Sequence, residues 1–137
     1  MQKIRLCLAF ILILSSAQIR AAEDENTAEK DKYAYLSLGD AMILNLSTKR
    51  SRLTFLQLKV DVLVNNSAAL ARIKIHIPAI RHQLILLLSE QDETDMKSPI
   101  QREELRKVAT TRVQEVMTGL TGSNDITELL FSSFLVQ

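Results

Sequence analysis

The sequence predicts an α+β domain in which an antiparallel sheet of three to four strands packs against two helices. The first observation behind this prediction is an alternation of apolar and polar residues, typical of half-buried strands, in one segment near residue 40 and another near residue 60. The second is that apolar residues recur every three or four positions in two later segments, as they do in helices. The 137 residues, 47% of them hydrophobic, suit one domain, because two domains would each be too small.

Two strands are expected in the first half of the domain. In residues 35–46 the four leucines and Met42 all fall on even positions, and Gly39-Asp40 marks a bend or bulge in this strand. In residues 56–64 the even-numbered residues are all apolar, whereas the odd-numbered residues from 57 to 61 are polar and point to the other face. A charged turn at 48–52 joins the two segments, so antiparallel pairing is the simplest topology.

The first helix is expected over residues 69–88. Asn65-Asn66-Ser67 offers capping side chains, and an apolar stripe follows it. The stripe consists of Leu70, Ile73, Ile77, Ile80, Leu84 and Leu87. Residues 69–77 also fit a strand, because apolar and polar residues alternate there and Pro78 is well placed to begin a helix. Periodicity leaves both alternatives open, and in one continuous helix Pro78 would remove the hydrogen bond to the Lys74 carbonyl and kink the helix.

The second helix is expected over residues 99–118, after a polar loop at 90–95. Ser98-Pro99 with Gln101 supplies an N-cap, a proline at the first helical position and a capping-box partner. The apolar stripe of this helix consists of Leu105, Val108, Val113, Val116 and Leu120.

This helix is expected to end at Gly119 or Gly122, and its outer face to hold an ion pair between Glu103 and Lys107. The final segment, residues 126–136, carries apolar side chains at both odd and even positions. That pattern is typical of a strand inside a sheet, covered by a helix on at least one face.

The first residues have the layout of a secretory signal. A basic start is followed by an apolar run over residues 6–14 and by the small residues Ser15-Ser16-Ala17. We therefore expect residues 1–17 to be a signal peptide cleaved near Ala17, with a short signal anchor as the alternative. Residues 18–32 are charged and almost free of apolar side chains, which predicts a flexible tether before a folded domain at 33–137.

The sequence contains no recognisable catalytic arrangement. His76 and His82 are the only histidines, too few and too far apart around a helix for a metal site. The three glycines form no phosphate-binding loop and no nucleophile elbow. A formal net charge of +1 does not provide the excess of positive charge with which proteins bind nucleic acid or anionic lipid. We expect a protein that is not an enzyme, holds no cofactor and binds no nucleic acid.

Five segments together resemble the FliL family of flagellar basal-body-associated proteins. They are YLSLGDAMILNLS, LTFLQLKVDVLV, IPAIRHQLILLLSEQ, SPIQREELRKVATTRVQEVMTGL and the terminal FSSFLVQ. The resemblance extends over residues 35–137, and its most distinctive parts are 78–88 and 131–137. None of these segments is a catalytic motif, so the resemblance lies in their order and spacing.

The resemblance implies a stomatin-like (SPFH-like) domain in the periplasm, with a helix rather than a strand at 69–77. It further implies a homo-oligomeric ring around the stator proteins MotA and MotB of the flagellar motor, in contact with other basal-body components and held at the inner membrane through the N-terminus. Such a ring would support torque, swimming and swarming. The alternative is a soluble periplasmic scaffold or binding module that acts outside the motor.

The surface for these contacts is expected on the second helix. Three basic residues, Arg102, Arg106 and Arg112, are expected on its exposed side. Self-association through sheet edges and helix faces would use them for polar contacts with neighbouring copies or with a partner.

Overall fold

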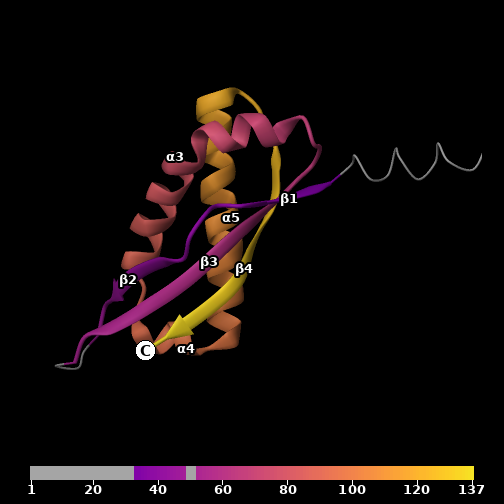
Figure 1. The fold of residues 1–137 in the computed structure, drawn as a ribbon. Coiled ribbons are helices and arrows are strands. Elements are labelled where there is room, and N and C mark those ends of the chain that lie inside the picture. Colours follow the sequence, from indigo (N-terminus) through magenta and orange to yellow (C-terminus); the bar gives the residue numbers. More distant parts are fainter. Residues whose placement is uncertain (1–32, 49–51) are drawn as a thin grey trace, which may run out of the picture. The chain divides into compact units, whose positions relative to one another are not determined.

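The computed structural model describes residues 33–48 and 52–137, and it confirms the α+β class with a four-stranded antiparallel sheet and three helices (Figure 1). The elements are β1 (Ala34–Ser37), β2 (Met42–Leu46), β3 (Thr54–Val64), α3 (Ala69–Ser89), α4 (Glu93–Lys97), α5 (Pro99–Thr121) and β4 (Ile126–Val136). The predicted signal peptide (1–17), the predicted tether (18–32) and the middle of the predicted turn lie outside the described residues.

The long strand β3 is the centre of the sheet. β4 pairs with it along one edge, from Leu56 to Val64, while β2 and β1 pair in succession along its other edge. The bend predicted at Gly39 separates β1 from β2: this glycine has φ +99°, a left-handed value that side-chain-bearing residues rarely adopt. The predicted antiparallel pairing is confirmed for both strands.

The prediction that residues 126–136 lie inside the sheet is wrong. β4 has the predicted bounds, but within the described sheet it pairs only with β3 and is an edge strand. Its apolar residues lie in different surroundings. Leu129 lies in the core, Phe131 and Phe134 pack at the margin of the core, and Leu135 is exposed. Register shifts between Lys59 and Val60 and between Leu63 and Val64 make the pattern along β4 irregular.

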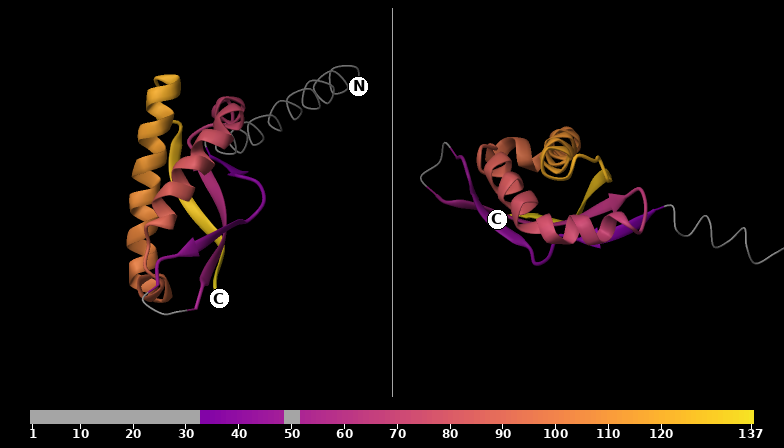
Figure 2. Two further views of the ribbon diagram at one scale, coloured as in Figure 1. Left: turned by 90° about the vertical axis from the view of Figure 1, so that its left-hand side faces the viewer. Right: turned by 90° about the horizontal axis from the view of Figure 1, so that it is seen from above.

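Residues 69–77 are helical, so the strand alternative is wrong. The Asn66 side chain accepts a hydrogen bond from the Ala69 N–H at 2.8 Å, at the start of α3. The buried side of α3 contains Ala69, Ile73, Ile80, Leu84 and Leu88. Pro78 lies inside the helix, and the ribbon bends along its length as predicted for a proline that cannot donate to the carbonyl one turn earlier (Figures 1 and 2).

The predicted loop at 90–95 is only partly a loop, because α4 begins within it. The Asp92 side chain accepts from the Thr94 N–H at 2.8 Å and so begins this short helix. A parallel bridge between Ser47 and Asp92 fastens the start of α4 to the end of β2. The sequence signal was an acidic residue in the capping position, which a run of other acidic residues obscured.

Helix α5 has the predicted serine N-cap, first-turn proline and terminal glycine, but Gln101 does not complete the predicted capping box, because the Ser98 N–H donates to the Asp95 carbonyl. The Ser98 hydroxyl accepts from the Gln101 N–H, Pro99 is in the first turn, and Gly122 with φ +74° ends the helix. The predicted apolar stripe was partly wrong, because Val108 and Leu120 are half exposed. The buried side consists of Leu105, Ala109, Val113 and Met117, one residue every four.

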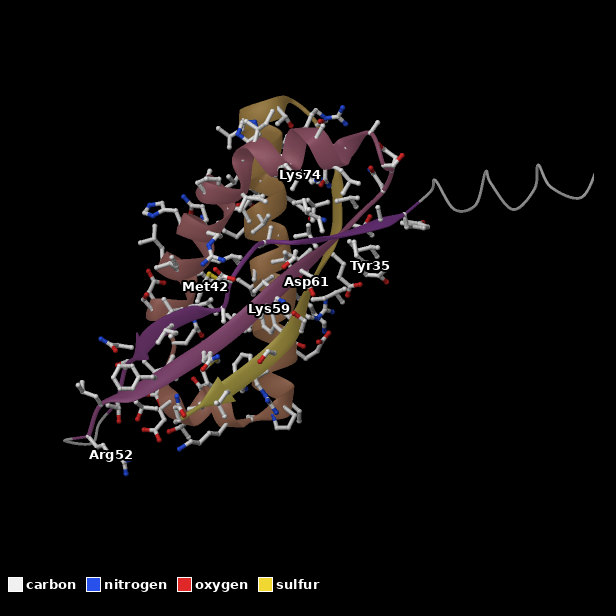
Figure 3. All side chains as sticks on the ribbon, viewed as in Figure 1. Tyr35, Met42, Arg52, Lys59, Asp61 and Lys74 are labelled. Carbon is white, nitrogen blue, oxygen red and sulfur yellow. The ribbon has the colours of Figure 1, made fainter. Side chains whose placement is uncertain are left out.

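Helices α3 and α5 cover one face of the sheet, and the core lies between them and the even-numbered residues of β3 (Figure 2). Among the described helices, none lies over the other face of the sheet. Lys59 and Asp61 lie on this uncovered face, with α5 behind the sheet in the same view (Figure 3). Tyr35 and Ile43 are exposed there as well, each at 69% of its full accessible area. The uncovered face therefore mixes charged and apolar side chains.

Candidate interaction site

The two predicted non-sites, a metal centre and a membrane span, can be compared with the residues that the structure describes. His76 is half buried and His82 exposed on α3, and no group of three or more potential metal ligands comes together in residues 33–48 and 52–137. Within the same residues, no helix has the length and apolar character needed to cross a bilayer. Among the described residues, a dense set of side-chain hydrogen bonds lies where α5 meets β4.

Arg106 is the centre of the contact between α5 and β4. Its guanidinium donates to both carboxylate oxygens of Glu103, at 2.8 and 2.7 Å, to the carboxylate of Glu128 and to the carbonyl of Leu129 at 2.9 Å. The hydrogen bonds to Glu103, together with the charge of Glu128, raise the pKa of Arg106 against the burial that lowers it. The ion pair predicted between Glu103 and Lys107 is therefore replaced: Glu103 pairs with Arg106, and Lys107 pairs with Glu104.

Side chains of α5 occupy the first half of the free edge of β4. Thr110 accepts from the Leu129 N–H at 3.2 Å, while Arg106 donates to the Leu129 carbonyl. Gln114 donates to the Ile126 carbonyl at 2.8 Å. Backbone groups that an edge strand would otherwise present to solvent or to another strand are thus already bonded. This half of the edge is closed by the protein itself.

The second half of that edge is open. Phe55 and Gln137 exchange both backbone hydrogen bonds, so Val136 and Phe134 point their N–H and C=O groups away from β3. Across residues 33–48 and 52–137, no hydrogen bond reaches these outward groups. The open edge runs beside the first turns of α5 (Figure 1).

A groove of about 360 Å³ reaches the start of this open half, at Phe134. Its lining residues are Pro99, Arg102, Glu103, Arg106, Leu130, Phe131 and Phe134. The rings of Phe131 and Phe134 pack with centroids 5.8 Å apart, and the guanidinium carbon of Arg102 stands 5.2 Å from the Phe134 centroid. An aromatic floor with a cation above it is suited to an apolar side chain next to an acidic one.

The three arginines predicted for a contact surface divide between two places. Arg102 and Arg106 line the groove, whereas Arg112 is exposed elsewhere on α5. That these residues contact a partner stays a prediction. The sequence predicted neither the two phenylalanines as site residues nor the open strand edge, although both rings belong to the distinctive terminal segment FSSFLVQ.

A second polar cluster joins α4 to the hairpin of β2 and β3. The buried carboxylate of Glu93 accepts from the Thr48 hydroxyl at 3.0 Å and pairs with Lys97. The hydrogen bond from Lys97, followed by that from Thr48, lowers the pKa of Glu93 from 4.5 to about 2. A cavity of about 330 Å³ adjoins the cluster, lined by Arg52, Thr54, Glu93, Lys97, Val136 and Gln137.

This cluster predicts a component of acid sensitivity. Because the pKa of Glu93 is lower in the folded than in the unfolded chain, its stabilising effect is complete above pH 4.5 and is lost as the pH falls toward 2. The variant Glu93→Gln should be less stable than the parent near neutral pH, and the difference should shrink across that window. Urea unfolding at a series of pH values measures it. A difference that is constant with pH would contradict the assignment, and Lys97→Met should flatten the same part of the profile.

Comparison with known proteins identifies the family. The family model described as flagellar basal body-associated protein FliL matches residues 35–137. The chain belongs to the FliL family. The match begins at the second residue of β1 and includes the whole of every later strand and helix that the structure describes. No curated protein matches the chain. As a FliL family member, the protein is associated with the flagellar basal body.

Proposed function

We propose that this protein is a non-enzymatic structural component of the flagellar motor, exported to the periplasm, where its copies assemble into a ring around the stator units and support torque. The observation that carries the proposal is the family match over residues 35–137. The partners would be further copies of the chain, the stator proteins MotA and MotB, and other basal-body components. The stomatin-like character expected for the domain belongs to this proposal.

The sheet supports self-association through its other edge, along β2. Met42, Leu44 and Leu46 lie opposite the even-numbered residues of β3, whose N–H and C=O groups point toward β2. Ile43 and Asn45 therefore point their backbone groups outward, and the described residues place no hydrogen-bond partner there. An open strand edge of this kind is a template for pairing with another chain.

The side chains near this edge also suit a second copy. Ile43 lies opposite Gln57 on β3, and Gln57 lies opposite Leu135 on β4, so the three form one row across the uncovered face. Ile43 and Leu135 are exposed apolar residues at the two ends of the row, with Phe55 next to it. Burying Ile43, the member of this row that lies on β2 itself, between copies would add apolar contact to the backbone pairing.

The edge is tested by replacing Asn45 with proline. Proline at this position removes an outward N–H that β3 does not use, so the fold should be retained while pairing with a second copy is blocked. We expect Asn45→Pro to shift the purified protein from oligomer to monomer in analytical ultracentrifugation, with an unchanged circular dichroism spectrum. Asn45→Thr, which keeps the N–H, is the matched control and should stay oligomeric.

Motility tests the function itself. Deleting the gene should reduce swimming and swarming, most clearly in viscous medium, and Asn45→Pro should reproduce part of the defect if the ring acts through this edge. Unchanged motility after deletion would contradict a role in the motor and would support the alternative of a periplasmic scaffold that acts elsewhere.

A further inference from the structure

We propose that the groove between α5 and the last residues of β4 binds an extended segment of a partner protein, which adds a strand to the open edge and places a carboxylate opposite Arg102. This inference goes beyond the ring, because it uses the opposite edge of the sheet from β2. It rests on three features of the described residues: an edge closed in one half and open in the other, an aromatic groove beside the open half, and one unneutralised cation.

The backbone supplies the first feature. Arg106, Thr110 and Gln114 occupy the outward groups of β4 as far as Leu129, but none of them reaches the groups of Phe134 and Val136. The last part of the edge is long enough for the few main-chain hydrogen bonds with which strand addition holds a peptide. A protein that closes one half of an edge with side chains and leaves the other half open has a defined place for an incoming strand.

The groove supplies the second feature. A strand lying beside β4 projects alternate side chains toward the helix side of the sheet, where the Phe131 and Phe134 rings form the floor of the groove. The volume of about 360 Å³ accepts one or two large apolar side chains. Specificity would come from these pockets and affinity from the backbone, as in other cases of strand addition.

Charge supplies the third feature. Arg102 and Arg106 both line the groove, but the guanidinium of Arg106 is already paired with the carboxylates of Glu103 and Glu128. Arg102 has no carboxylate within ion-pairing distance among residues 33–48 and 52–137, and its guanidinium lies over Phe134. A carboxylate on the incoming segment would form an ion pair with Arg102. Because the groove is partly shielded from solvent, this ion pair would be stronger than one at an open surface.

The same geometry argues against β2 of a second copy as the occupant. The side chains of β2 that would face the groove from a neighbouring sheet are Met42, Leu44 and Leu46, and all three are buried in the core of their own copy. A folded edge strand thus has nothing to place in the groove. The occupant has to be a segment with free side chains on both faces.

The probe for this proposal is a display library of random dodecapeptides, selected against the intact purified protein. We expect enriched peptides to combine alternating apolar residues with an aspartate or glutamate. Selection against Arg102→Glu should replace that acidic residue by lysine or arginine, whereas Arg112→Glu, the same charge change on an exposed part of α5, should leave the selected sequences unchanged.

Nuclear magnetic resonance with the best selected peptide then locates the contact. The amides of Phe134 and Val136 should become protected from exchange on binding, whereas the amide of Leu129, which already donates to Thr110, should change little. Val136→Pro removes one outward donor and should weaken binding at least tenfold, while Val136→Thr should retain it. Failure to enrich any peptide, acidic enrichment that persists with Arg102→Glu, or protection at other amides would overturn the proposal. None of these results bears on oligomerisation through β2, so the two proposals fail separately.

Discussion

Replacing Leu58 with alanine should lower the free energy of unfolding by about 2–5 kcal/mol. Leu58 lies in the middle of β3 and is fully buried, at 0% exposure, beneath the helices. The alanine variant loses the transfer free energy of the removed carbons, and neighbours fixed on three sides by β2, β4 and the helices cannot close the cavity completely. This is the largest effect we expect from a single truncation.

Urea unfolding followed by circular dichroism measures this effect, and thermal unfolding should show a fall in Tm of about 4–8 °C for each kcal/mol. Leu53→Ala is the matched control, because it removes the same atoms from a side chain that is 67% exposed. Its effect should stay within about 0.5 kcal/mol. Equal losses for the two variants would show that β3 is not the centre of the folded protein.

The elements predicted best are those whose signals are local. Helix α5 has a capping serine, a proline and a terminal glycine within its own segment, and β3 alternates without a break because one of its faces is buried along its whole length. For residues 69–77, periodicity was equally consistent with a strand. The choice between them depends on packing against the sheet, which no local pattern contains.

The errors have the same origin. Val108 and Leu120 fit a helical stripe in the sequence, but Ala109 and Met117 are buried in their place. Helix α3 covers part of the same face of the sheet, so only a narrow side of α5 contacts the core. The position of β4 at the edge could not be predicted either. Its apolar residues on both faces fit an internal strand. In the fold, Leu129 lies in the core, Phe131 and Phe134 line the groove, and Leu135 is exposed to solvent.

The groove could be predicted only in part. The cluster of arginines on α5 was visible in the sequence, but Arg102 meets Phe134 across 32 residues of chain, and only the pairing of β4 with β3 brings them together. Sequence alone also gave Arg102, Arg106 and Arg112 the same expected role. Their surroundings differ so much that their replacement should have different consequences.

Arg106→Met should reduce the free energy of unfolding by about 1–3 kcal/mol. The side chain of Arg106 is 18% exposed, and its loss leaves the Leu129 carbonyl without its donor and removes the partner of Glu103 and Glu128. These two carboxylates are partly exposed, so solvent screens much of their repulsion and most of the loss comes from the carbonyl and from packing. Lysine cannot place parallel donors on Glu103 and still reach Leu129, so Arg106→Lys should recover only part of the stability.

The effect of salt on stability distinguishes an Arg106 that anchors β4 to α5 from one that only forms exposed ion pairs. High ionic strength weakens exposed charge pairs but leaves a hydrogen bond to a backbone carbonyl, so the difference between Arg106→Met and the parent should largely persist in about 1 M salt, where the Debye length is about 3 Å. Arg112→Met, an exposed arginine on the same helix, is the control and should stay within about 0.5 kcal/mol of the parent. If the loss of stability in Arg106→Met disappears at high salt, Arg106 contributes only exposed ion pairs. A persistent loss would mean that Arg106 holds β4 against α5, leaving Arg102 as the arginine of the groove whose charge is available to a partner.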